Sequence, residues 1–348
     1  MRKTIFWVAL ACALALLCPR ARAASEELEA LMAEFRARYE LDESSFALSY
    51  CDTVTGEEYN YNETAFMVAA STYKLPLNLY YYELEAAGEL SPDIPVTEAC
   101  TLAEAHMQSL LWSNNEVSHA LIYRLGSFTA YKQAMRRFFT MADEEISPLY
   151  YEDNYYCTRM MLDTLRVLWQ KQEQFSEALD YLTQAMPEAY FRRGVPDLPV
   201  AHKYGSFEGA ENDVGIIWAA HPFLLAVYTA SEKYYGEEIC AQAAALLRAY
   251  TDRQARLEAH AQDVRPAHTA QRPEQAEAPE ASPAPAAEEA CSPDARETAA
   301  EAAELRAAAM RITERMGKDT APGRAWLLPA AAAALGLALL RLRRRKRS

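Results

Sequence analysis

The alternation of apolar and polar positions divides residues 24–252 into strand-like and helix-like segments. A period of two indicates strands at Phe46–Tyr50 and Glu58–Tyr61, and three further strand-like runs lie at Pro199–His202, Val214–Ala219 and Pro222–Ala230. Helical spacing predicts Glu26–Arg38, Ser71–Ala87, Thr101–Trp112, Asn115–Leu125, Ala130–Phe139, Thr158–Lys171, Ser176–Met186 and Tyr234–Tyr250. This order predicts an α+β domain, with an antiparallel sheet built from both chain ends and packed with the helical block.

Residues 1–23 have the features of a secretory signal peptide. Arg2 and Lys3 precede an apolar run, and Ala21-Arg22-Ala23 fits a small-x-small cleavage site. A retained membrane anchor is the less favoured alternative. A lipoprotein signal ending at Cys18 is less favoured still, because its neighbours lack the small residues of a lipobox.

The opposite end of the chain resembles a stop-transfer sequence. The uncharged run Ala325–Leu340 precedes a cluster of arginines and lysine, which predicts a transmembrane anchor at residues 325–341 and a basic cytoplasmic tail at 342–348. We therefore expect a single-pass protein of the cell membrane with its folded domain outside the cytosol. A buried helix is the alternative, and a sortase signal is disfavoured because no Leu-Pro-x-Thr-Gly precedes the run.

Residues 253–324 are predicted to form a disordered linker. The segment is rich in Ala, Pro and Glu and contains no aromatic residue, so it cannot bury enough apolar surface to offset the entropy of ordering. Within it, Ala295–Arg315 lacks Gly and Pro and favours a solvated helix.

Charge and cysteine content exclude several classes of function. The chain has a net charge of −14, which argues against a nucleic acid partner. The cysteines remaining after signal removal, Cys51, Cys100, Cys157, Cys240 and Cys291, are odd in number and widely spaced, so they form no recognisable disulfide framework, although one or two bridges stay open. No cysteine or histidine spacing predicts a metal site, and no motif predicts a cofactor.

Ser71-Thr72-Tyr73-Lys74 lies at the start of a predicted helix. The spacing of three places the Lys74 amine over the Ser71 hydroxyl, where it can take the proton as the hydroxyl attacks a carbonyl carbon. The pattern Ser-x-x-Lys, with any two residues between, arises by chance about once in a chain of this length.

Two further segments carry candidate chemistry. Ser113-Asn114-Asn115 lies between two predicted helices, where Ser113 could relay a proton and Asn115 could hold a substrate amide; the simpler alternative makes Ser113 a helix N-cap. Lys203-Tyr204-Gly205-Ser206 ends a predicted strand, where a lysine can project into a cleft and the backbone N–H of Ser206 can face a carbonyl. An exposed strand end is the structural alternative.

Together the three segments resemble the penicillin-recognising serine enzymes, and class A β-lactamases most closely. That family carries Ser-x-x-Lys, Ser-Asp-Asn and Lys-Thr/Ser-Gly in this order. The flanking segments Phe66–Ala70, Pro95–Glu98 and Leu224–Thr229 also match, so the resemblance covers about residues 25–250. It implies a β-lactamase/transpeptidase-like fold.

The resemblance also implies roles for individual residues. Ser71 is then the acylated nucleophile, Lys74 its base and Ser113 the proton relay, with Lys203 supplying electrostatic support. The implied substrate contacts are Asn115, Tyr204, Gly205 and Ser206, with the backbone N–H groups of Ser71 and Ser206 as an oxyanion hole.

The chain departs from the family pattern at four places. Asn114 replaces the usual Asp, Tyr204 replaces a small Thr or Ser that helps to bind the substrate carboxylate, and Val214 stands where many members have an Arg. The deacylating Glu of a Glu-x-x-x-Asn motif is missing. The candidates in the same stretch, Glu144, Glu145 and Glu152, do not have Asn four positions later.

These observations favour a β-lactamase-like serine hydrolase that forms an acyl-enzyme with β-lactams and hydrolyses it slowly. The alternatives are a D-alanyl-D-alanine carboxypeptidase, whose substrate is a peptidoglycan stem peptide, and a non-catalytic member of the fold that binds a wall fragment. The expected partners are a β-lactam or a stem peptide and, through the anchor helix, the membrane. We expect a monomer.

Overall fold

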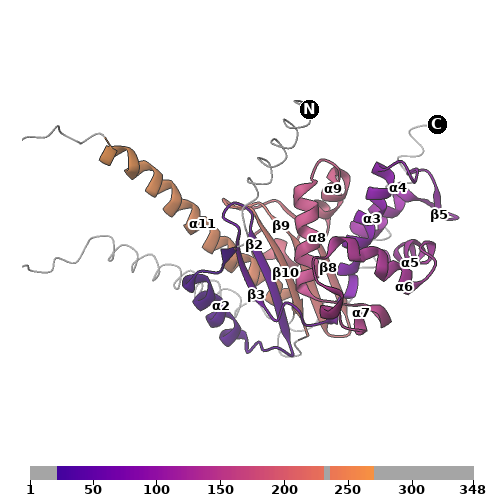
Figure 1. The fold of residues 1–348 in the computed structure, drawn as a ribbon, viewed down its shortest axis with the longest axis horizontal. Coiled ribbons are helices and arrows are strands. Elements are labelled where there is room, and N and C mark those ends of the chain that lie inside the picture. Colours follow the sequence, from indigo (N-terminus) through magenta and orange to yellow (C-terminus); the bar gives the residue numbers. More distant parts are fainter. Residues whose placement is uncertain (1–21, 231–235, 270–348) are drawn as a thin grey trace, which may run out of the picture. The chain divides into compact units, whose positions relative to one another are not determined.

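The computed structural model describes residues 22–230 and 236–269 of the chain (Figure 1). The α-helices are α2 (Glu26–Tyr39), α3 (Lys74–Ala86), α4 (Leu102–Leu110), α5 (Asn115–Arg124), α6 (Phe128–Met135), α7 (Leu149–Glu152), α8 (Thr158–Gln170), α9 (Ser176–Gln184), α10 (Tyr190–Gly194) and α11 (Gly236–Thr269). The 3-10 helices are η1 (Ala70–Tyr73), η2 (Arg136–Phe138) and η3 (Asp143–Glu145). The strands are β1 (Arg22–Ala23), β2 (Phe46–Asp52), β3 (Glu57–Tyr61), β4 (Met67–Val68), β5 (Pro95–Thr97), β6 (Cys100–Thr101), β7 (Tyr155–Tyr156), β8 (Val200–Phe207), β9 (Ala210–Ile217) and β10 (Phe223–Thr229).

The main sheet joins both ends of the domain, as the sequence predicts. Its six strands lie in the order β1-β3-β2-β10-β9-β8. The early strand β2 pairs antiparallel with the late strand β10, with Tyr50 opposite Leu225, and β8 pairs antiparallel with β9. The exception to this antiparallel pattern is β1, which runs parallel to β3. The predicted α+β fold class is confirmed.

Both faces of the sheet are covered by helices, so its central strands are buried throughout. On β2, Phe46, Leu48 and Tyr50 belong to an apolar cluster with residues of α2 and α11. The alternate face contributes Ala47 to a second cluster that contains residues of α3, α6 and α8. Figure 1 shows α2 and α11 on one side of the sheet and α8 on the other. This arrangement explains why the strands are more continuously apolar than a sheet with one solvated face.

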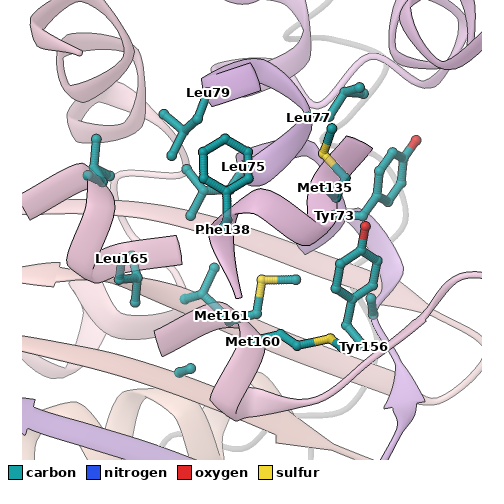
Figure 2. Packing of buried hydrophobic residues seen from close by; sticks show 14 of the residues in the cluster. Tyr73, Leu75, Leu77, Leu79, Met135, Phe138, Tyr156, Met160, Met161 and Leu165 are labelled. Atoms are coloured by element: carbon teal, nitrogen blue, oxygen red, sulfur yellow. The ribbon is translucent and has the colours of Figure 1, made fainter. Parts of the chain in front are cut away.

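The helical block forms the larger of the two clusters, in which side chains of α3 and α8 pack around Phe138. Figure 2 shows Leu75 and Leu79 of α3 near Phe138, and Met160 and Met161 of α8, all of them buried. The leucines stabilise the start of α3 by burial, and that helix supplies Lys74. The cluster thereby holds the predicted nucleophile segment rigidly beside the sheet.

The late hairpin is longer than predicted, which changes the position of the candidate lysine. Strand β8 continues through Phe207 instead of ending at His202, because it pairs with β9 along its whole length. Glu208 and Gly209 form the connection with φ values of 47° and 83°, the backbone that a tight two-residue hairpin turn requires. Lys203 therefore lies within a strand and is fully buried, so the alternative interpretation as an exposed strand end is wrong.

The structure also changes two predicted boundaries, the start of the linker and the end of the signal peptide. Helix α11 runs to Thr269 instead of ending at Tyr250, so the prediction of disorder from residue 253 is wrong as far as 269. Arg253 forms an ion pair with Glu27 of α2, and the segment is rich in helix-forming Ala and Arg. Arg22 and Ala23, assigned by sequence to the signal peptide, form β1 opposite Glu57 and Glu58. Residues 1–21, the rest of the predicted linker, the predicted anchor at 325–341 and the predicted tail at 342–348 lie outside the described residues.

Cys51, Cys100, Cys157 and Cys240 are free thiols, all buried. Among the residues that the structure describes, none of the helices is both long and apolar enough to cross a lipid bilayer.

Candidate active site

Ser71 lies in the 3-10 turn η1, directly after a residue with strained backbone. Ala70 has a φ of 48°, a conformation that costs a residue with a side chain about 1 kcal/mol or more. The Asn154 amide Nδ2 donates to the Ala70 carbonyl at 2.7 Å, and the Ala69 N–H donates to the Asn154 carbonyl at 2.9 Å. Asn154 therefore holds the strained turn that presents the Ser71 hydroxyl.

Lys74 occupies the centre of the site and is fully buried. Its Nζ donates to Ser71 Oγ at 3.0 Å and to Ser113 Oγ at 3.1 Å. It also donates to the Ser113 carbonyl at 2.7 Å and to Asn115 Oδ1 at 2.6 Å. Burial lowers the pKa of Lys74 to about 7. A substantial fraction of the amine is therefore neutral near neutral pH and can accept the proton of Ser71.

Ser113 bridges the two candidate lysines. Its Oγ accepts from Lys74 and also from Lys203 Nζ at 3.1 Å. The residue has a φ of 55°, while its neighbour Asn114 serves as the N-cap of α5 by accepting the Val117 N–H. The alternative prediction, that Ser113 is the cap, is therefore wrong. The Ser113 hydroxyl is placed to pass a proton between the Lys74 side of the site and a leaving group.

Lys203 is the second buried cation. Its Nζ donates to the Tyr204 carbonyl at 2.8 Å in addition to Ser113 Oγ. Burial holds the pKa of Lys203 well below its usual range, and the neighbouring charge of Lys74 acts in the same direction. In its protonated form either lysine would add positive charge to the site, which stabilises an oxyanion intermediate.

Gly205 sets the distance between β8 and the nucleophile turn. A Cβ atom at this position would lie 2.5 Å from the Ser71 backbone nitrogen and 3.1 Å from the Ala69 carbonyl oxygen. Only a glycine allows this approach. The close contact brings the backbone of Ser71 beside the segment that contains Ser206, which is the arrangement that the predicted oxyanion hole needs. The Ser206 side chain itself is exposed.

Asn115 and Tyr204 differ from their predicted roles as simple substrate contacts. Asn115 uses its Oδ1 to accept from Lys74, so it also belongs to the hydrogen bonds around the base. The Tyr204 ring lies over Lys203, with Nζ 4.0 Å from the ring centroid, and it stacks against Tyr190 at 5.4 Å between centroids. Burial raises the pKa of Tyr204, and a hydrogen bond with Ser113 opposes that shift.

The three glutamates suggested for deacylation are not brought to the nucleophile. Glu145 accepts the Ala142 N–H and pairs with Arg159 at 3.5 Å, and Glu144 and Glu152 are exposed. Among the described residues, Lys74 has hydroxyl, carbonyl and amide acceptors but no carboxylate partner. The structure therefore contains no positioned carboxylate base within this part of the chain.

Sequence reasoning missed the residues that support the turn from the loop side. Lys132 is buried, and its Nζ donates to the Tyr155 carbonyl at 3.2 Å while lying 3.9 Å from the Tyr156 ring centroid and 4.2 Å from that of Tyr150. Tyr155 directly follows Asn154. A lysine within a predicted helix that precedes a tyrosine-rich loop is the signal that could have pointed to this support.

We expect acylation of Ser71 to depend on pH through Lys74. Because burial lowers the pKa of Lys74 to about 7, the neutral amine predominates above that pH and the ammonium below it. The acylation rate should rise about tenfold per pH unit up to a pH of about 7 and then level off. Stopped-flow measurements with a fluorescent penicillin between about pH 5 and pH 9 give the acylation rate at each pH. A flat profile contradicts the assignment of Lys74 as base.

Asn154→Ala is expected to slow acylation by about tenfold. The substitution removes one buried hydrogen bond to the Ala70 carbonyl, worth about 1–1.5 kcal/mol, and releases the strained turn. Asn60→Ala, which changes an exposed asparagine on β3, is the matched control and should leave the rate unchanged. Equal rates for the two variants would show that Asn154 does not position Ser71.

Comparisons with known proteins agree with this geometry. A variant of the last common ancestor of Gram-negative bacteria class A β-lactamase is 24% identical, with a TM-score of 0.54 over 65% of this chain and 98% of its own. The structure of PBP-A is 14% identical, with a TM-score of 0.57 over 68% of this chain and 99% of its own. A variant of PBP-A solved as an acyl-enzyme complex with penicillin G gives the same values. At these identities the likeness concerns the fold.

No relative of this chain was found among curated proteins. A family model, described as the β-lactamase enzyme family, matches residues 23–110 and 98–251, which together include every site residue described above. These matched segments span most of the chain, and they contain the serine, the two lysines and the bridging hydroxyl in one buried cluster. The chain belongs to the β-lactamase enzyme family, with the β-lactamase/transpeptidase-like fold.

Proposed function

We propose that this protein is an active-site-serine hydrolase that forms an acyl-enzyme with β-lactams. The observation that carries the proposal is the position of Lys74 Nζ, within hydrogen-bond distance of both Ser71 Oγ and Ser113 Oγ in a buried site. A neutral amine there can accept the Ser71 proton, while the bridging hydroxyl leads to the side where a leaving group departs.

The reaction follows from these contacts. Ser71 Oγ attacks the amide carbonyl of the β-lactam and Lys74 takes its proton. The oxyanion that forms lies at the backbone N–H groups of Ser71 and Ser206. The carbon–nitrogen bond then breaks, and the nitrogen receives the proton through Ser113 from Lys74. The products are an ester on Ser71 and an amine that remains part of the opened ring.

Hydrolysis of that ester is proposed to be slow. No carboxylate of the described residues contacts Lys74, and Glu145 is already paired with Arg159. Loss of a positioned general base slows a step by about 10²–10⁴-fold. The acyl-enzyme should therefore accumulate. The fold relative captured as an acyl-enzyme complex with penicillin G supports a β-lactam as acyl donor.

Labelling with penicillin tests this function. The full chain is incubated with penicillin G, digested and mapped by mass spectrometry, and turnover of a chromogenic cephalosporin is followed in parallel. We expect one covalent adduct, on the peptide that contains Ser71, together with slow turnover. Absence of an adduct with both penicillin G and its uncharged methyl ester, or an adduct elsewhere, contradicts the acyl-serine mechanism. Fast turnover would mean that one of the three glutamates acts as base, and Glu→Gln variants of each would identify it.

A peptide of the cell wall is the alternative acyl donor for the same chemistry. Its amide is less reactive than a strained β-lactam ring, and the lack of a deacylating carboxylate among the described residues favours such an enzyme over rapid β-lactam hydrolysis. The signal-like start and the anchor-like end of the sequence support a location at the outer face of the cell membrane. Protease treatment of intact cells tests that location, because an external domain is digested and a cytosolic one is protected.

A further inference from the structure

The amine of Lys203 is already engaged by groups of the protein itself. A lysine carries at most three N–H groups. Here one faces Ser113 Oγ and one the Tyr204 carbonyl, while the Tyr204 ring covers the amine at 4.0 Å. The Lys203 side chain is fully buried. A substrate carboxylate would have to displace one of these groups, of which the aromatic ring is the largest, to reach this amine.

The neighbouring positions offer no substitute cation within the described chain. Val214, opposite Lys203 on β9, is apolar and buried. The two arginines that follow Tyr190 are both engaged, Arg192 with the Thr183 carbonyl and Arg193 with Glu237 and Glu238. The wall of the site beside Lys203 is therefore aromatic rather than cationic.

This aromatic wall is held in place from behind. Tyr190 stacks on Tyr204 with an interplanar angle of 30°. The next residue, Phe191, donates its N–H to Asp213 Oδ2 at 3.0 Å, and the same carboxylate oxygen lies 2.7 Å from His202 Nδ1. Asp213 and His202 are both fully buried. The position of Tyr190, and through it that of the Tyr204 ring, is thus built into the core.

We propose that Tyr204, backed by Tyr190, makes the site specific for acyl donors whose group beyond the scissile amide is uncharged, such as an internal peptide linkage, rather than for donors with a free carboxylate there. This inference rests on the proposed acyl-serine function and names its substrate class. The edge of the Tyr204 ring contacts that neutral group, and Lys203 acts on Ser113 instead of on the substrate. Tyr204 is then a specificity-determining residue.

A matched pair of substrates tests the proposal. Penicillin G and its methyl ester share the same β-lactam ring and differ in the charge of one group. Acylation rates of the full chain with each compound are divided by the rates of hydroxide-catalysed ring opening, which removes the difference in intrinsic reactivity. For the wild type we expect the corrected rate with the acid not to exceed that with the ester by more than about threefold.

Tyr204→Thr uncovers Lys203 and adds a compact hydroxyl. A hydrogen bond to a charged group contributes about 1.5–3 kcal/mol, so the variant should raise the acid-to-ester ratio by about tenfold or more. Tyr204→Phe keeps the ring and should retain the wild-type ratio. Thermal unfolding shows whether each variant folds. If a variant does not fold, the acid-to-ester ratio of the wild type still tests the proposed preference for uncharged donors.

The outcomes separate this inference from the function beneath it. A wild-type preference for the acid of more than about threefold, or a ratio unchanged in a folded Tyr204→Thr variant, overturns the specificity while the Ser71 adduct still supports acyl-serine chemistry. Failure of both compounds to label Ser71 overturns the function and the inference together. A wild type that is acylated faster by the ester than by the acid, together with the opposite order in Tyr204→Thr, supports Tyr204 as the specificity-determining residue.

Discussion

Lys74→Met is expected to slow acylation of Ser71 by about 10²–10⁴-fold. The amine is the base that contacts the Ser71 hydroxyl, at 3.0 Å, and the methionine side chain fills a similar volume without a proton acceptor of comparable strength. The rate of adduct formation with a fluorescent penicillin measures the loss. A variant that still acylates within about tenfold of the wild type would transfer the role of base to another group.

The same substitution should leave the fold intact. Folding lowers the pKa of Lys74 from 10.5 to about 7 because of burial, so the unfolded chain binds more protons than the folded one between these values. Stability therefore rises with pH across this window, and the Lys74 part of that rise is missing in Lys74→Met. Thermal unfolding at several pH values detects the difference. Lys171→Met, at a half-exposed lysine that pairs with Glu83, is the control for both rate and slope.

Gly205→Ala is expected to reduce acylation by at least about 10²-fold. The added Cβ would meet the Ser71 backbone nitrogen at 2.5 Å and the Ala70 Cβ at 3.0 Å. Strand β8 or the η1 turn must then move, which separates the two backbone donors that face the oxyanion. Loss of one such donor alone costs about 10²–10³-fold in rate.

Gly209→Ala separates this effect from the general cost of replacing a glycine. Gly209 lies in the turn between β8 and β9 with a φ of 83°, and a Cβ there meets no atom within 4 Å. The variant loses about 1 kcal/mol of stability through its backbone, yet its acylation rate should equal that of the wild type. Equal rates for Gly205→Ala and the wild type would show that the close approach of β8 to Ser71 is not needed for acylation.

Local sequence patterns predicted most of the helices and strands. The predicted ends were wrong where contacts between distant segments determine how far an element extends. Strand β8 was predicted to stop at His202 because Gly205 and the polar residues around it resemble a turn. Its pairing with β9 keeps it extended to Phe207. Helix α11 was predicted to stop at Tyr250, and it continues to Thr269, with Arg253 paired to Glu27 of α2 at the start of the extension.

In the candidate site, too, local motifs identified residues that the structure brings together, and position along the chain did not. Ser71, Lys74, Ser113 and Lys203 were all identified from three short motifs, and the structure places their side chains in one cluster. The glutamates proposed for deacylation were chosen by position along the chain alone. In the fold they are exposed or paired with other groups, because the loop that carries them turns Asn154, and not a carboxylate, toward the serine.

The sequence by itself determined the fold class, the family resemblance and the main reacting groups, because motif spacing on a helix, a loop and a strand expresses local geometry. Only the tertiary structure decided which side chains contact those groups and how deeply the groups are buried. Asn154, Tyr190 and Lys132 act through contacts with residues far away along the chain, which no local pattern encodes. The burial that lowers the pKa of Lys74, and the ring that covers Lys203, arise from packing around them.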